Sequence, residues 1–173
     1  MARKISLREF QESVAAKLQS LATNATANPS KLGVKIGSKF WLVNLSDISE
    51  MLPVPVLTAV PLAQPWFNGV ANFRGNLYGI VDLSHFLDGA PTTIGVDCRL
   101  LLVHQKFSVN CGLVVSRMLG LRNPEQMRFA EVGGDLSPWV AAEYLDEDGQ
   151  RWQELNMLAL TEHAQFLNVG LTP

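Results

Sequence analysis

The stretch of residues 65–83 constrains the fold of this chain more than any other part of its sequence. It reads PWFNGVANFRGNLYGIVDL and consists of two apolar runs that meet at Gly75-Asn76. A Gly-Asn pair between two such runs is a hairpin signal, because glycine adopts the positive φ that a tight turn between antiparallel strands needs. We therefore predict two strands joined at Gly75-Asn76, with Arg74 at the tip of the hairpin.

The charge of Arg74 at this tip has two interpretations. A guanidinium offers five donors in a planar fork and stays charged, so beside a glycine it can lie over an exposed backbone or pair with a carboxylate. In the other interpretation, Arg74 is a solvated turn residue without a specific role. The residues alone leave both interpretations open.

Composition limits the class of protein. Of the 173 residues, 47% are hydrophobic and 17% are charged, which is enough for a full core in one domain or two small lobes, and disorder is not expected. The net charge of −2 and the pI of about 5.9 argue against nucleic-acid binding, which needs a basic face.

The apolar runs of the chain indicate a cytoplasmic location without direct membrane insertion. No run approaches the roughly 20 residues of a membrane span, and the basic N-terminus is not followed by the apolar region of a signal peptide. Cys98 and Cys111 form no C-x-x-C motif. In a reducing compartment we expect them to be two buried free thiols.

Residues 1–30 are predicted to form an N-terminal amphipathic helix and a linker. Ser6 and Glu9 have the spacing of a capping box, and apolar residues then recur at helical spacing as far as Ala22. Residues 23–30 are small and polar and are typical of a linker. The helix packs on its own domain or docks into a groove of a partner, and the sequence leaves both possibilities open. Its apolar stripe consists of Leu7, Phe10, Val14, Leu18 and Leu21.

Residues 31–173 are predicted to form a mainly β domain of two lobes, which are divided near residues 85–97. Short apolar runs alternate with turns rich in Gly and Pro, as in small barrels or a sandwich. A closing helix is predicted over residues 156–167, with short helical turns at 45–51 and 123–125. Most of the four tryptophans are expected to fill the core. Besides the hairpin, the predicted strands are 33–36, 39–43, 99–104, 109–115, 127–132, 139–145 and 150–155.

No motif indicates catalysis, a metal or a cofactor. The three histidines, His85, His104 and His163, are scattered and lack a zinc-binding spacing. The chain has neither a G-x-S-x-G nucleophile elbow nor a P-loop, and the turn that begins at Asp146 lacks the ligands of a calcium loop. We therefore expect a protein that is not an enzyme and that presents a surface to other proteins.

The hairpin sequence also resembles a known family. WFNGVANFRGNLYGIVDL is similar to the G-V-x-N-x-R-G-x-x-x-x-(I/V)-V-D-L core of the CheW domain, which couples chemoreceptors to their histidine kinase. The similarity extends to Asp47–Met51 and to residues 111–115, and it covers roughly residues 32–170. It implies two five-stranded SH3-like barrels packed together, with an N-terminal and a C-terminal helix.

The resemblance also implies a function and its residues. The N-terminal extension, residues 45–55 and the tail 166–170 are similar to the branch of the family that serves type IV pili and twitching motility. The implied protein is an adaptor between the cytoplasmic tip of a PilJ-like methyl-accepting receptor and the regulatory domain of a CheA/ChpA-type histidine kinase, recruited to receptor arrays at the inner membrane. The family's partner-facing positions fall on Ile48, Glu50, Arg74 and Leu101, and Asn72 and Gly75 shape the loop that presents Arg74.

An alternative interpretation comes from a different class of function. A small barrel can also be a recognition module for a proline-rich or extended peptide, unrelated to chemosensing. Such a module needs an exposed aromatic groove and does not depend on Arg74.

Overall fold

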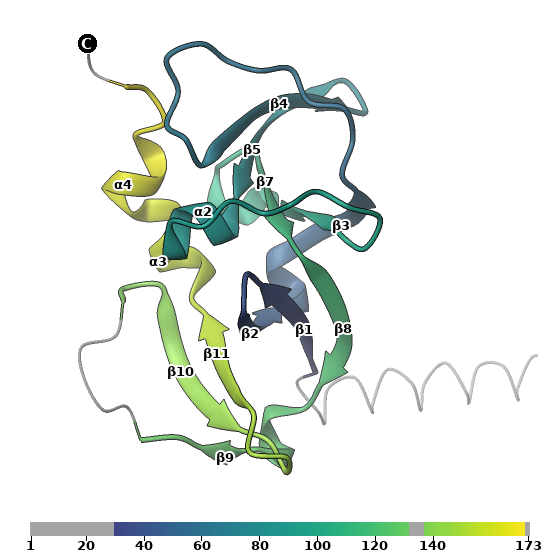
Figure 1. The fold of residues 1–173 in the computed structure, drawn as a ribbon, viewed down its shortest axis with the longest axis vertical. Coiled ribbons are helices and arrows are strands. Elements are labelled where there is room, and N and C mark those ends of the chain that lie inside the picture. Colours follow the sequence, from purple (N-terminus) through teal and green to yellow (C-terminus); the bar gives the residue numbers. More distant parts are fainter. Residues whose placement is uncertain (1–29, 132–136, 172–173) are drawn as a thin grey trace, which may run out of the picture. The chain divides into compact units, whose positions relative to one another are not determined.

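The computed structural model describes residues 30–131 and 137–171, which form a mainly β fold with two sheets (Figure 1). The predicted β class is therefore confirmed. The helix predicted over residues 7–22 lies outside the described residues, and the boundary near residue 30 stays a prediction.

The first sheet has six strands, one more than the resemblance implied, because the two-residue strand β9 adds to its edge. Its order in space is β8-β1-β2-β11-β10-β9. The strands are β1 (Lys31–Ile36), β2 (Lys39–Asn44), β8 (Arg117–Arg122), β9 (Arg128–Phe129), β10 (Val140–Leu145) and β11 (Arg151–Leu155).

The second sheet has five strands in the order β3-β6-β7-β5-β4. They are β3 (Ile48–Pro53), β4 (Phe67–Phe73), β5 (Asn76–Asp82), β6 (Arg99–Val103) and β7 (Cys111–Val115). The helices that connect or follow the strands are η1 (Leu45–Asp47), α2 (Leu83–Asp88), η2 (Gln105–Phe107), η3 (Pro124–Gln126), α3 (Met157–Glu162) and α4 (Ala164–Leu167).

The division of the strands near residues 85–97 does not describe how they pair. Strands β1 and β2 join β8–β11 in the six-stranded sheet, whereas β6 and β7 join the earlier strands β3–β5. Four neighbouring pairs join the two halves of the chain: β1 with β8 and β3 with β6 are antiparallel, and β5 with β7 and β2 with β11 are parallel. Parallel neighbours need long crossovers, so the apolar pattern of each strand does not reveal its partner.

The five-stranded sheet is buried on both faces. On β6, Leu101 and Val103 belong to a large core to which both sheets contribute, whereas Leu100 and Leu102 belong to a smaller core on the opposite face. This two-sided burial explains the continuous apolar run of β6, because a strand with one solvated face alternates instead. As expected, most of the tryptophans are interior: Trp41, Trp66 and Trp152 are buried.

The hairpin turn lies one residue earlier than predicted. Phe73 pairs with Asn76, so the two turn residues are Arg74 and Gly75, with φ of 52° and 86°. Two-residue turns in which both residues have positive φ match the twist of the flanking strands. Arg74 therefore lies within the turn itself.

Other differences arise where local signals compete. The closing helix is divided into α3 and α4 at His163, whose backbone is extended and whose Nδ1 accepts a hydrogen bond from the Gln165 N–H. Only residues 45–47 of the predicted turn 45–51 are helical, since strand β3 follows. Strand β8 and helix α2 were not predicted. Strand β8 contains Gly120 at a φ of 82°, and α2 begins after Asp82, which is its N-cap.

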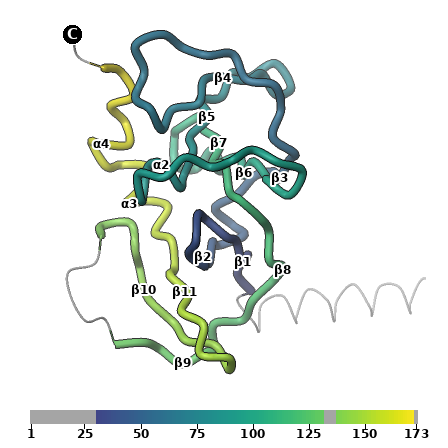
Figure 2. Tube along the Cα trace, viewed as in Figure 1, coloured from purple at the N-terminus to yellow at the C-terminus, as the bar shows by residue number. Residues whose placement is uncertain are grey.

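The connection after β3 returns to the far edge of the five-stranded sheet (Figure 2). Thr58 and Val70 exchange two backbone hydrogen bonds of 2.9 Å, so the continuation of β3 pairs with β4. Gly69 permits this approach. Its φ is 123°, and a Cβ there would lie 2.2 Å from the Thr58 carbonyl oxygen.

We expect Gly69→Ala to lower the free energy of unfolding by at least about 2 kcal/mol, because backbone must move to admit the methyl group. Gly95→Ala is the control, since nothing lies within 4 Å of a Cβ there, and its effect should stay within about 1 kcal/mol. Urea unfolding measures both variants. Equal stability of the two would contradict the close approach of Thr58 to Gly69.

Cys98 and Cys111 are both free and buried, as expected. Burial raises the pKa of the Cys111 thiol to about 12, whereas an unfolded cysteine titrates near ~8.5. The folded thiol therefore stays neutral as the pH rises past ~8.5, while the unfolded thiol ionises, and stability falls with rising pH in that range.

Two measurements check this assignment for Cys111. Iodoacetamide at pH 8 should alkylate Cys111 far more slowly in the native protein than in urea, because the thiolate is the nucleophile. The loss of stability above pH ~8.5 should be smaller in Cys111→Ala than in the wild type. Rapid native alkylation of Cys111, followed by mass spectrometry, would show that the thiol is accessible.

Candidate functional site

Arg74 and Glu50 form an ion pair at one end of the five-stranded sheet. The Arg74 Nη2 lies 3.0 Å from the Glu50 Oε1, and the two side chains are 81% and 32% exposed. Glu50 belongs to β3 and Arg74 to the β4–β5 turn, so the pair joins the two outer strands of the sheet. The structure thus brings together two of the residues that the resemblance selected.

Asn72 and Gly75 shape the turn that carries Arg74. The Asn72 Oδ1 accepts a hydrogen bond of 3.1 Å from the Gly75 N–H, and Gly75 supplies the positive φ that the second turn position needs. Arg74 adopts positive φ as well, which costs a residue with a Cβ about 1 kcal/mol. No extensive packing offsets that cost, because most of the Arg74 side chain is exposed.

Ile48 and Leu101 do not belong to this surface. Both are buried in the large core, and Leu101 has no exposed area. The pairing of β3 with β6 shifts register between Ile48 and Glu50, and such a bulge reverses the face on which the following side chains lie. The prediction that Ile48 and Leu101 face a partner is therefore corrected, since neither side chain is available for a direct contact.

A hollow of about 260 Å³ lies beside the ion pair, and we call it the Tyr78 hollow. Tyr78 was not among the predicted site residues. The sequence signal that could have found it is its place on β5 two residues after Asn76 at the hairpin turn, because such residues share a face of a strand. The rings of Phe73 and Tyr78 meet edge to face at 5.7 Å. The hollow is lined by Ser49, Glu50, Phe73, Arg74, Asn76, Tyr78, Leu102, His104 and Gln105.

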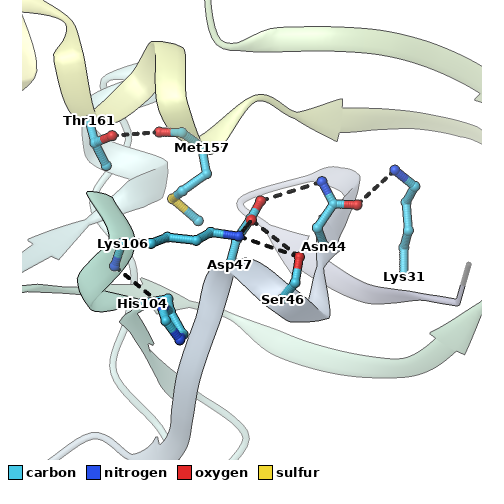
Figure 3. Close-up of polar contacts among 8 residues, drawn as sticks. All are labelled: Lys31, Asn44, Ser46, Asp47, His104, Lys106, Met157 and Thr161. Carbon is cyan, nitrogen blue, oxygen red and sulfur yellow. Dashed lines mark hydrogen bonds and ion pairs between the residues drawn. The ribbon is translucent and has the colours of Figure 1, made fainter. Parts of the chain in front are cut away.

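A buried carboxylate at Asp47 holds the start of β3 in place (Figure 3). Its Oδ1 lies 2.7 Å from the Lys106 Nζ, and its Oδ2 accepts a hydrogen bond of 3.4 Å from the Asn44 amide. The Asp47 carbonyl accepts a hydrogen bond of 2.8 Å from the His104 N–H. These contacts fix β3 relative to His104, and therefore fix two walls of the Tyr78 hollow.

The network continues to the six-stranded sheet. The Asn44 Oδ1 accepts a hydrogen bond of 2.9 Å from the Lys31 Nζ, and Lys31 also pairs with Glu154. Glu154 in turn accepts a hydrogen bond from the Tyr144 hydroxyl. Burial, reinforced by this bond and by the charge of Glu154, raises the pKa of Tyr144 to about 12.

Within residues 30–131 and 137–171, no group of three or more His, Cys, Asp or Glu side chains is placed to hold a metal ion. In the same ranges, no helix is both long and apolar enough to cross a bilayer.

Asp82 is buried, and its carboxylate has a structural role. It accepts hydrogen bonds from the His85 and Thr92 N–H groups and from the Thr92 hydroxyl.

We predict that Arg74→Gly leaves the free energy of unfolding within about 1 kcal/mol of the wild type. If the value changes, we expect it to rise, so that the variant is slightly more stable. The substitution removes a strained turn residue and an exposed ion pair that contributes roughly 0–1 kcal/mol. Arg74→Val should lose at least ~1 kcal/mol, because a β-branched residue fits positive φ poorly. If urea unfolding shows similar large losses in both variants, the arginine side chain itself supports the fold.

Known proteins resemble this chain over most of the described residues. The family model of the CheW-like domain matches residues 31–165. Protein PilI of Pseudomonas aeruginosa is 30% identical over 146 residues, which cover 82% of this chain and 80% of PilI. The crystal structure of the scaffolding protein TtCheW from Thermoanaerobacter tengcongensis has a TM-score of 0.65 at 14% identity, covering 80% of this chain and 95% of TtCheW, and this likeness concerns the fold alone.

Proposed function

Because this chain belongs to the CheW-like domain family, we propose that it is a non-catalytic adaptor between a methyl-accepting chemoreceptor and a histidine kinase. Its partners are the cytoplasmic tip of a PilJ-like receptor and the regulatory domain of a CheA/ChpA-type kinase. The similarity to PilI supports a chemotaxis-like system that controls type IV pili and twitching motility. The adaptor acts in the cytoplasm and is recruited to receptor arrays at the inner membrane.

The observation that carries this proposal is the exposed guanidinium of Arg74 on a turn that is unfavourable for arginine. Gly or Asn occupies positive φ at lower cost, and the side chain is 81% exposed. Backbone strain that brings no packing is typical of residues kept for contact with another molecule. Asn72 and Gly75 shape the turn that presents this guanidinium, which pairs with Glu50 in the free protein.

The alternative function, recognition of a proline-rich or extended peptide, has less support. It requires an exposed aromatic groove, whereas Trp41, Trp66 and Trp152 are buried. The Phe73 and Tyr78 rings line the hollow beside Arg74, so an aromatic site at this position would depend on the arginine as well.

We predict that Arg74→Ala weakens binding to the kinase regulatory domain, the receptor tip or both by roughly 1–3 kcal/mol, the size of a charge-assisted contact in an interface. Arg74→Lys should restore only part of the loss, because a point charge does not reproduce the planar fork. Calorimetry with each purified partner measures binding, and thermal melting measures stability.

Arg117→Ala is the matched control. Arg117 is also exposed and also pairs with a carboxylate, Asp97, at 2.6 Å, but it lies on β8 of the other sheet. It should leave binding unchanged. Equal affinity of the wild type, Arg74→Ala and Arg74→Lys for both partners would remove Arg74 from the interface, and absence of any binding by the wild type would refute the adaptor function.

A further inference from the structure

The Tyr78 hydroxyl has no hydrogen-bond partner among the residues that the structure describes. The Tyr78 residue is only 7% exposed, so its ring is buried. Since the hydroxyl is not among the fully enclosed unpaired atoms, it retains access to solvent beside the hollow that Tyr78 lines. A tyrosine with a buried ring and an accessible, unpaired hydroxyl is suited to hydrogen-bond a group that enters from outside.

The Arg74 guanidinium lies beside the same hollow, and most of its hydrogen-bond donors have no partner in the described part of the chain. Arg74 makes a single hydrogen bond, from Nη2 to Glu50, within the described part of the chain, although a guanidinium has five donors and suits a bidentate carboxylate. The ion pair is largely exposed, and exposed pairs are held weakly. Glu50 can therefore be exchanged for another carboxylate and turn to solvent.

We propose that the Tyr78 hollow receives the carboxylate of an Asp or Glu side chain from a partner protein, which replaces Glu50 on Arg74 and accepts a hydrogen bond from the Tyr78 hydroxyl. This proposal rests on the adaptor function, because it specifies the chemistry of the partner at the same site. The positive charge of Arg74 favours an anion, and Phe73 and Leu102 supply apolar walls for the stem of the incoming side chain. In the free protein, Arg74 holds the Glu50 carboxylate instead.

The proposed exchange predicts an unusual effect for a substitution of Glu50. If Glu50 competes with the partner's carboxylate, Glu50→Gln should tighten binding, because the competing charge is removed while the size of the side chain is kept. If Glu50 instead contacts the partner or holds Arg74 in its binding position, the same substitution should weaken binding. The direction of the change therefore distinguishes the two arrangements.

Tyr78→Phe is the second substitution that tests the proposal. It removes only the hydroxyl, which has no partner among the described residues, so melting should be unchanged while binding weakens about three- to tenfold. Tyr144→Phe is the matched control, because the hydroxyl of the other tyrosine already bonds to Glu154 at 3.0 Å, outside the hollow. It should affect stability rather than binding.

The first experiment titrates the full-length protein with sodium acetate, with sodium chloride at equal ionic strength as the reference, and follows the side-chain N–H signals of Arg74 and Arg117 by NMR. We expect saturable shifts at Arg74 alone, an affinity at least twofold higher in Glu50→Gln and at least threefold lower in Tyr78→Phe. Equal shifts at both arginines, shifts that do not saturate, or lower affinity in Glu50→Gln would overturn the proposal.

The second experiment repeats the calorimetry with the kinase regulatory domain and the receptor tip. Tighter binding of Glu50→Gln and weaker binding of Tyr78→Phe to either partner support the exchange, and loss of binding in Glu50→Gln overturns it. If neither partner binds the wild type, the adaptor function fails. The acetate titration then still decides whether the hollow accepts a carboxylate, so the two failures can be told apart.

Discussion

The backbone pairing of Thr58 with Val70 is the contact on which the geometry of the site depends. It brings the continuation of β3 against β4, so the two outer strands of the five-stranded sheet lie close together. Glu50 on one strand then meets Arg74 on the turn that follows the other. The whole arrangement requires Gly69, because any Cβ at that position would collide with the Thr58 carbonyl.

Two local distortions then decide which side chains face outward. The register shift between Ile48 and Glu50 sends Ile48 into the large core and leaves Glu50 beside the hollow. The positive φ of Arg74 completes a tight turn and projects the guanidinium into solvent. Both features cost local stability, and the large core formed by the two sheets tolerates that cost.

The site therefore combines a rigid frame with groups that are not fully satisfied. Asp47 and its partners hold the start of β3, and the Asn72 amide holds the turn. Within that frame, and counting only partners in the described part of the chain, Arg74 keeps spare donors and Tyr78 keeps an unpaired hydroxyl. Such an arrangement fits the proposed exchange of carboxylates, because the frame needs little ordering on binding and an exposed ion pair is weak.

Local pattern in the sequence was enough to predict most strands, the helical turn at 123–125 and the hairpin, because periodicity and turn chemistry act over a few neighbouring residues. The resemblance, not local pattern, selected Asn72, Arg74 and Gly75 for the site. The exchange of strands between the sheets, the buried positions of Ile48 and Leu101, and the Tyr78 hollow could not be predicted in this way. They depend on pairings such as Gly79 with Cys111 and Glu50 with Leu102, which join segments far apart in the chain. Strand partners and bulges leave little trace in local composition, so the fold itself had to determine which side chains form the surface.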